Sequence, residues 1–234
     1  VGIIVDSTSV SKQLGDLIAL SKQSENYEIS ALVFNSAEYK KKNISSHLYS
    51  YINRRGINRN LNNALFRLVC KAKSFVVMRS TKFHNFYSKV DLKTRDFLTI
   101  NVKPNISQNG LFYSNCVEDI ERIKGLNLDL LVRGGGGILG GDILDVCPKG
   151  VISFYHGVNE INRGGPPGFW EVYERNPTTG FIIQRLKNES DGGVVLYKGF
   201  VSTSWFYGLN LAKLYEVANP FFHQVLDDIT SEKQ

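Results

Sequence analysis

The sequence has few cysteines and no long apolar run. Its three cysteines, Cys70, Cys116 and Cys147, are far apart and odd in number, which argues against a disulfide framework and against a zinc site of closely spaced thiols. No apolar run approaches the ~20 residues that a membrane span needs. Residues 1–6 are mostly apolar and lack a preceding basic segment, so they predict a core strand and not a signal peptide. We therefore expect a soluble, cytoplasmic protein with no membrane partner.

The chain carries a moderate positive charge. Its 234 residues include 28 lysines and arginines against 22 acidic residues, giving a net charge of +6. This balance favours an anionic partner, such as a nucleotide, a phosphorylated sugar or a folate tail, and does not establish nucleic-acid binding. The densest basic tract, Lys40 to Lys42 followed by Arg54, Arg55 and Arg59, is typical of a solvated loop.

The apolar pattern alternates between strand-like and helix-like segments. Strands are predicted for residues 2–5, 27–34, 75–78, 97–102, 112–113, 128–132, 150–154, 181–186 and 194–197. Helices are predicted for residues 14–23, capped by residues 6–8, for part of 35–60, for 61–69, for 117–124 with Gly125 as the stop, for 143–146, and for 209–226 with a break near Pro220.

This alternation predicts an α/β protein with a doubly wound, mostly parallel, Rossmann-like sheet. The parallel part should end near residue 157, before a C-terminal strand pair and a closing helix. We expect a single domain over residues 1–234, with residues 199–234 as a C-terminal helical extension. In such sheets the ligand sits beyond the carboxyl ends of the strands.

Three features lie where ligand-binding residues are expected. Four consecutive glycines, Gly134 to Gly137, follow a strand and form either a flexible turn or a loop that lets a ligand approach the backbone. Tyr155 and His156 follow another strand, close to Asn162, Arg163 and Gly164, and form either a surface turn or a proton-handling site. Residues 188–193 combine acids with glycines, which is typical of a hairpin turn.

Taken in order, these features resemble the 10-formyltetrahydrofolate-dependent formyltransferases, the family of methionyl-tRNA and sugar N-formyltransferases. The segments that carry the resemblance are DLLVRGGGGIL at residues 129–139, GVISFYH at 150–156, RGGPPGFW at 163–170, and TGFIIQRL at 179–186 with DGG at 191–193. The clearest match covers residues 128–198, and the N-terminal part agrees only in its α/β pattern.

The resemblance implies a fold, a reaction and a set of roles. It implies that 10-formyltetrahydrofolate donates a formyl group to an amine without a metal ion. Donor binding falls to Arg133, Gly134, Gly135, Gly136, Gly137, Ile138, Leu139 and Asn188, and acceptor binding to Asn162, Arg163 and Gly164. The resemblance assigns catalysis to Ser153, Tyr155, His156 and Asp191. Hydrogen-bond donors stabilise the oxyanion, and the aspartate orders a water that helps to deprotonate the amine.

The chain departs from the family pattern at three positions. Ser153 stands where the family has asparagine, and Tyr155 stands at the position of the catalytic histidine. Because successive strand residues point to opposite faces, His156 should point away from where that histidine points. A tyrosine can donate a hydrogen bond to an oxyanion, but it is a poor proton shuttle at neutral pH. Gly135 replaces a bulkier residue, which should loosen the grip on the pterin ring.

Three functions are compatible with this pattern. The first is an N-formyltransferase acting on an amino sugar, nucleotide-linked, because the chain leaves no room for the C-terminal tRNA-binding domain of its relatives. The second is a catalytically degenerate binding or scaffolding protein. The third, a formyl-folate hydrolase, is disfavoured because such relatives carry an additional N-terminal domain. The aromatic segment at residues 204–207, with Phe221 and Phe222, serves either core packing of a helix on the sheet or contact with a partner chain in a homodimer.

Overall fold

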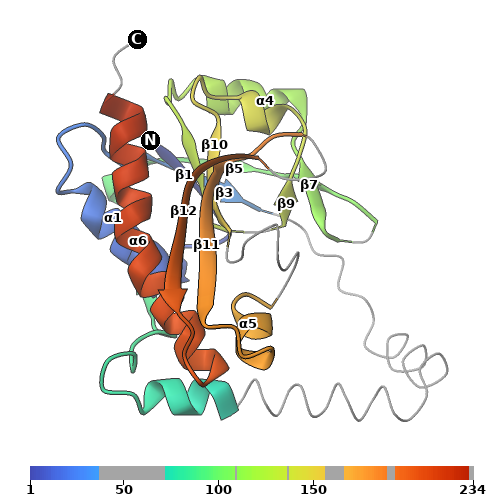
Figure 1. Cartoon of the computed structure of the whole chain (residues 1–234). Helices are drawn as coiled ribbons and strands as arrows, with labels where there is room; N and C mark the ends of the chain where they lie inside the picture. The colour runs from blue at the N-terminus through green and yellow to red at the C-terminus, as the bar shows by residue number, and fades with distance from the viewer. Residues whose placement is uncertain (37–71, 109, 136, 156–165, 189–192, 232–234) are drawn as a thin grey trace, which may run out of the picture.

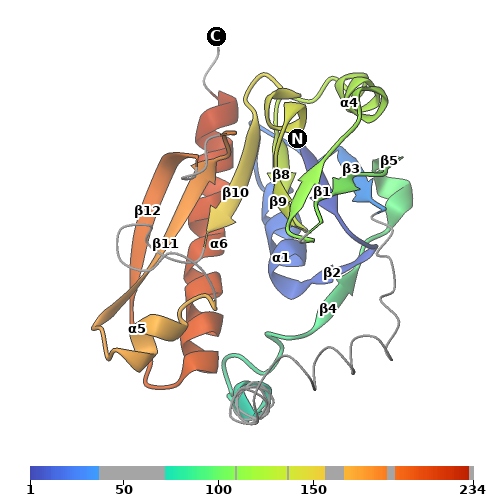
Figure 2. The same ribbon diagram turned by 90° about the vertical axis from the view of Figure 1, so that its right-hand side faces the viewer.

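The fold is built on one seven-stranded sheet, shown in Figures 1 and 2. The structure, a computed structural model, describes residues 1–36, 72–108, 110–135, 137–155, 166–188 and 193–231. The strand order is β12-β11-β10-β8-β1-β3-β5. The strands are β1 (Gly2–Val5), β3 (Ala31–Asn35), β5 (Leu98–Val102), β8 (Leu131–Arg133), β10 (Val151–Tyr155), β11 (Thr178–Arg185) and β12 (Val194–Ser202).

The sheet is parallel on one side and antiparallel on the other. Strands β10, β8, β1, β3 and β5 run parallel to one another, whereas β11 pairs antiparallel with both β10 and β12. The predicted α/β class, the end of the parallel part near residue 157 and the terminal strand pair are therefore confirmed.

Different elements cover the two faces of the sheet. One face, here called the α1–α6 face, packs against α1 (Lys12–Ser21) and α6 (Tyr207–Ser231). The other, the α4–β9 face, packs against α4 (Val117–Lys124), the 3-10 helix η2 (Asp142–Asp145) and a small sheet of β6 (Asn105–Ile106), β7 (Phe112–Ser114) and β9 (Ile138–Leu139). The remaining elements are β2 (Ser9–Ser11), β4 (Lys89–Asp91), η1 (Thr94–Asp96) and α5 (Phe169–Tyr173).

Two hydrophobic clusters, one on each face, divide the core. Because strand side chains alternate, Val132 and Ile152 join the cluster under α1 and α6, while Leu131 and Val151 join the cluster under α4 and β9. All four side chains are completely buried. This alternation fixes which face each residue at the strand ends serves.

The first helix, Lys12–Ser21, begins and ends two residues before the predicted limits of 14 and 23. Residues 9–11 are extended as β2, paired with β4, so residues 6–8 do not cap the helix. The cap is Ser11, whose Oγ accepts a hydrogen bond from the Leu14 amide. The second predicted strand begins later than the predicted residue 27, at Ala31.

Residues 72–78 are helical, so the strand predicted for 75–78 is wrong. Phe75 and Met78 are half exposed and only Val77 is fully buried, which is the pattern of a helix touching the body along one stripe. An apolar run of four residues does not distinguish the two structures. The helices predicted within residues 35–60 and over 61–69 lie outside the described residues, apart from residues 35 and 36 at the end of β3.

The closing helix is continuous, so the break predicted near Pro220 is wrong. Pro220 lies inside the 25-residue α6. A proline removes one helical hydrogen bond and crowds the preceding turn. Here Leu214 and Ala218 on one side and Phe222 on the other are buried in the same cluster, which holds both halves against the sheet. Within the described residues no helix, α6 included, is long and apolar enough to cross a membrane.

Candidate active site

Polar residues gather where the core strands β8 and β10 end. Arg133 closes β8, and Ser153 and Tyr155 lie in the last three positions of β10. Their neighbours Val132 and Phe154 belong to the α1–α6 side, so alternation places Arg133, Ser153 and Tyr155 on the α4–β9 face. The structure thus brings three of the predicted site residues to one face at one end of the sheet.

The side chain of Arg133 is tied to the glycine run that follows it. Its Nη2 donates a hydrogen bond to the Gly137 carbonyl, and its Nε is buried with no partner among the described residues. Burial lowers the pKa of Arg133, and the negative charge of Asp6 acts in the opposite direction. Arg133 therefore shapes the glycine loop while keeping one buried donor available.

Asp6 fills the space that Gly135 leaves open. A Cβ built on Gly135 would lie 2.7 Å from the Asp6 Oδ2 atom. Only glycine permits this approach, because real Cβ atoms essentially never come so close. A carboxylate that follows β1 thus packs against the backbone of Gly135; that Gly135 loosens a ligand pocket stays a prediction. Sequence reasoning did not place Asp6 at this site.

The rest of the glycine loop is fixed on both sides. The Gly134 amide donates to the Ile4 carbonyl at 2.9 Å, extending the contact between β8 and β1. Gly137 has a φ of 42°, and a Cβ there would lie 1.8 Å from the Tyr113 ring. Gly136 lies outside the described residues. The described glycines on both sides of Gly136 therefore have defined backbone contacts.

The loop leads into β9, which contains Ile138 and Leu139. This strand pairs with β7 and buries Leu139, while Ile138 is 48% exposed. Asn188 comes to the same region, because its Oδ1 accepts a hydrogen bond from the Gly141 amide at 2.7 Å. This hydrogen bond brings Asn188 close to the loop that carries the other residues predicted to bind the formyl donor.

Asn188 does not reach the carboxyl end of β10. Since β11 is antiparallel, Tyr155 pairs with Ile182, and the Leu186 amide donates to the Val151 carbonyl at the start of β10. Ser153 is only 2% exposed, and its Oγ lies 3.4 Å from the Phe154 carbonyl, a length typical of a weak hydrogen bond. The other predicted residues, His156, Asn162, Arg163, Gly164 and Asp191, lie outside the described residues.

Two cavities lie on the opposite, α1–α6 face. One, of about 250 Å³, is lined in part by Arg133 to Gly135 and by Ser153; the other, of about 440 Å³, lies between α1 and α6. Gln13, Tyr215 and Asn219 line both. Sequence reasoning did not select these three residues, although Gln13 follows the first strand–helix turn, a common ligand position in doubly wound sheets.

The described residues contain no group of histidines, cysteines or acids that could hold a metal ion. Of the two described cysteines, Cys116 is exposed and Cys147 is buried, and burial raises the pKa of Cys147 to about 11.

No family model and no curated protein matches the chain in sequence. Solved structures do resemble it. Phosphoribosylglycinamide formyltransferase from Bacillus halodurans is 14% identical with a TM-score of 0.56, over 100% of this chain and 96% of that one. Glycinamide ribonucleotide transformylase 1 from Geobacillus kaustophilus is 10% identical with a TM-score of 0.59, over 98% and 97%.

A formyltetrahydrofolate deformylase from Pseudomonas syringae has a TM-score of 0.58 at 12% identity; the match covers 99% of this chain and 60% of that one. These identities are low, so the likeness establishes the fold and leaves the substrates open. With a central, mostly parallel seven-stranded sheet in common with these enzymes, the chain has the formyltransferase fold.

Proposed function

We propose that the protein transfers a formyl group from 10-formyltetrahydrofolate to the amine of a nucleotide-linked amino sugar. The observation that carries the proposal is the placement of Arg133, Ser153 and Tyr155 on one face of the sheet, at the strand ends of a formyltransferase fold. Ligands of such sheets bind at this edge.

The proposed chemistry is nucleophilic attack by a neutral amine on the formyl carbon. Ser153 and Tyr155 donate hydrogen bonds to the oxyanion of the tetrahedral intermediate, because hydroxyl groups aimed at developing charge lower the barrier. Asp191 accepts the amine proton through a water, and His156 is the alternative proton acceptor. The intermediate then expels tetrahydrofolate, leaving the formamide.

The donor would lie along the loop between β8 and β9. The exposed side chain of Ile138 offers an apolar surface there, and the unpartnered Nε of Arg133 offers a buried donor. Asn188 supports this segment through Gly141. These features suit a flat, polar-edged ring such as a pterin.

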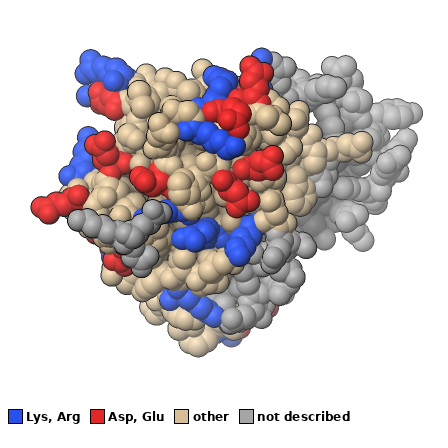
Figure 3. Space-filling model, turned by 90° about the horizontal axis from the view of Figure 1, so that it is seen from above, with Lys and Arg blue, Asp and Glu red and all other residues tan. Residues whose placement is uncertain are grey.

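The acceptor assignment is supported by charge. Residues 37–71 contain eight lysines and arginines and one acidic residue, which accounts for the positive excess of the whole chain. The amino ends of the parallel strands, in contrast, present a mixture of basic and acidic side chains (Figure 3). A basic segment favours a phosphate-bearing acceptor, for which Asn162, Arg163 and Gly164 remain the proposed contacts.

The direct test combines donor binding with turnover. We expect calorimetric titration with 5-formyltetrahydrofolate, a stable analogue of the donor, to give micromolar binding. With 10-formyltetrahydrofolate and a panel of nucleotide-linked amino sugars, we expect formylated product detected by mass spectrometry. Asp191→Asn should abolish product formation while donor binding persists.

Two other results would change the assignment. Donor binding without transfer to any amine, together with a silent Asp191→Asn variant, would favour the degenerate binding protein. If Tyr155→His raises turnover by an order of magnitude or more, the natural tyrosine weakens an otherwise intact site. Absence of donor binding would refute the proposal.

A further inference from the structure

The cavity between α1 and α6 is a groove whose lining includes none of the residues assigned to formyl transfer, although it shares three wall residues with the smaller cavity. It has a volume of about 440 Å³ and runs between α1 and α6, closed by the turn at residues 82–86. Its apolar walls are formed by Ala19, Leu20, Phe83, Phe86, Tyr215 and Pro220. Volumes of this size are typical of small-molecule sites.

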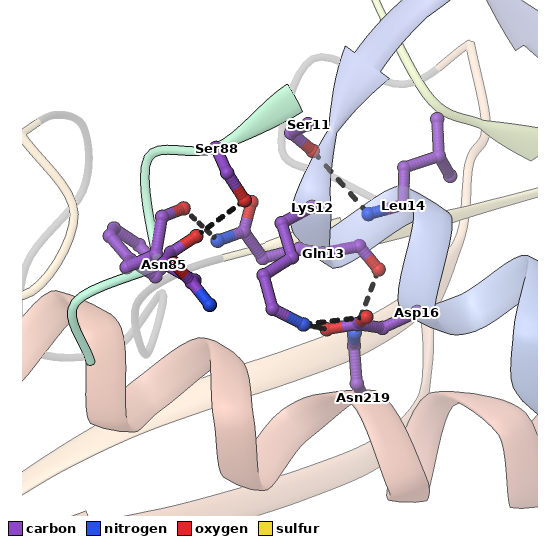
Figure 4. Close-up of polar contacts among 9 residues, drawn as sticks. Ser11, Lys12, Gln13, Leu14, Asp16, Asn85, Ser88 and Asn219 are labelled. Carbon is purple, nitrogen blue, oxygen red and sulfur yellow. Dashed lines mark hydrogen bonds and ion pairs between the residues drawn. The ribbon is translucent and has the colours of Figure 1, made fainter. Parts of the chain in front are cut away.

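Hydrogen bonds between its walls preform the groove (Figure 4). The Gln13 side chain donates to the Phe86 carbonyl at 2.8 Å, and the Asn219 side chain donates to the Gln13 carbonyl at 2.8 Å. These two bonds connect the turn to α1 and α1 to α6. The rings of Phe86 and Tyr215 lie 5.7 Å apart, so the aromatic walls meet at one end.

The charges at the groove neutralise one another. Lys12 pairs with Asp16 at 2.5 Å, and Lys82 pairs with Glu216 at 2.8 Å. All four residues line the groove. An ionic ligand would have to compete with one of these pairs, whereas a neutral ligand leaves both intact.

We propose that this groove binds a neutral, planar aromatic or heteroaromatic ring of one or two fused rings. Aromatic walls favour a planar ring through stacked and edge-on contacts. The side-chain amides of Gln23 and Asn85, which also line the groove, supply donors and acceptors for ring heteroatoms. The site differs from the one proposed for formyl transfer, because none of the residues assigned to that reaction lines the groove.

Ligand binding in the groove can change the conformation of the strand that carries Ser153 and Tyr155. Tyr215 forms part of the groove wall and stacks on Phe154, with ring centroids 5.7 Å apart and planes at 27°. Phe154 lies between Ser153 and Tyr155 in β10. A ligand that displaces the Tyr215 ring therefore changes the position of the Phe154 ring. This second step rests on the proposed function; the binding site itself does not.

Binding is tested by calorimetric titration of the full chain with adenine and with indole, and with cyclohexanol as a non-aromatic probe of similar size. We expect saturable 1:1 binding of at least one aromatic probe and at least tenfold weaker binding of cyclohexanol. Ala19→Phe, which fills the groove from an exposed position on α1, should weaken ring binding at least tenfold. Ala72→Phe, the same change at an exposed helical position outside the groove, should leave it unchanged.

The proposal is overturned if neither aromatic ring binds up to its solubility limit, if cyclohexanol binds equally well, or if Ala19→Phe binds as tightly as the wild type. The coupling is tested by repeating the 5-formyltetrahydrofolate titration with the groove saturated. We expect at least a threefold change in donor affinity that Phe154→Leu removes while ring binding persists. An unchanged donor affinity refutes the coupling alone, and absence of donor binding with an empty groove refutes the proposed function alone.

Discussion

The two faces of the central sheet use the same strands for different purposes. On the α1–α6 face, Phe154 stacks with Phe181 and Tyr215 and packs near Phe222, and the interior is aromatic. On the α4–β9 face, the strand ends carry Arg133, Ser153 and Tyr155 beside a glycine loop. The cavities of about 250 and 440 Å³ lie on the aromatic face, and a third, of about 450 Å³, lies beside Val1 and Asp129.

The difference teaches that cavity size does not locate the proposed chemistry here. The cavity between α1 and α6 is lined by two ion pairs, side-chain amides and apolar walls, and by none of the residues assigned to formyl transfer. The opposite face offers hydroxyl groups and a buried, unpartnered arginine donor. One residue step along β10 changes the function from packing to proposed catalysis.

Single substitutions in β10 give the strongest test of this difference between the two faces. Phe154→Ala should lower the free energy of unfolding by about 3 kcal/mol, because it removes an aromatic side chain from the packed face. Tyr155→Ala should lower it by only about 1 kcal/mol. Urea denaturation followed by circular dichroism measures both. Equal losses would mean that alternation does not separate the two faces at this strand end.

In the turnover rate, in contrast to stability, we expect the large effect at Tyr155. Tyr155→Phe removes one proposed oxyanion donor and should lower kcat about 100-fold, with stability within about 0.5 kcal/mol of the wild type. Tyr173→Phe is the matched control, since Tyr173 is 72% exposed on α5. Wild-type kcat in Tyr155→Phe would remove the phenol from the mechanism and leave His156 as the residue to test.

A third change sharpens the description of the glycine loop. Gly135→Ala forces the Asp6 carboxylate away from the backbone and should cost about 2 kcal/mol of stability. Combining it with Asp6→Ala should recover part of that loss, because the clash disappears. A double-mutant cycle should give a coupling of about 1 kcal/mol. Strict additivity would show that the two residues do not share this space.

The sequence predicts the central strands of the parallel core well, because side chains such as those of β1 are buried on both faces and form continuous apolar runs. The edge strand β5 is mostly exposed and is the exception. Residues 2–5, 98–102 and 151–155 emerge within a residue or two of their predicted limits. Predictions fail where tertiary contacts decide. Residues 72–78 are helical although their apolar run permits a strand, and α6 passes through Pro220 because both halves are buried.

The candidate site is predictable in part for the same reason. Alternation alone assigns Ser153 and Tyr155 to one face of β10. The contact between Asp6 and Gly135 is not predictable, because it joins two strand ends that are 129 residues apart in sequence and adjacent only through the pairing of β1 with β8. The groove between α1 and α6 is equally hidden, since its walls come from three distant segments.

Tyr215 provides the finest test of the aromatic face, through the pH dependence of stability. Burial raises the pKa of Tyr215 above its ordinary value of 10.0, with a smaller contribution from Tyr207, and burial likewise raises the pKa of Tyr27. Below pH 10 the folded and unfolded chains both keep these protons, so stability is complete. Above pH 10 the unfolded chain ionises first, so the free energy of unfolding must fall as pH rises.

Each such tyrosine adds at most about 1.4 kcal/mol per pH unit to this decline. Tyr215→Phe should therefore reduce the slope between pH 10 and 11 by up to that amount, measured by urea denaturation at closely spaced pH values. Tyr173→Phe, at an exposed position, should leave the slope unchanged. Since Tyr215 separates the groove from Phe154, an unchanged slope in Tyr215→Phe would mean that its hydroxyl is solvated, and the wall between the groove and β10 would be open.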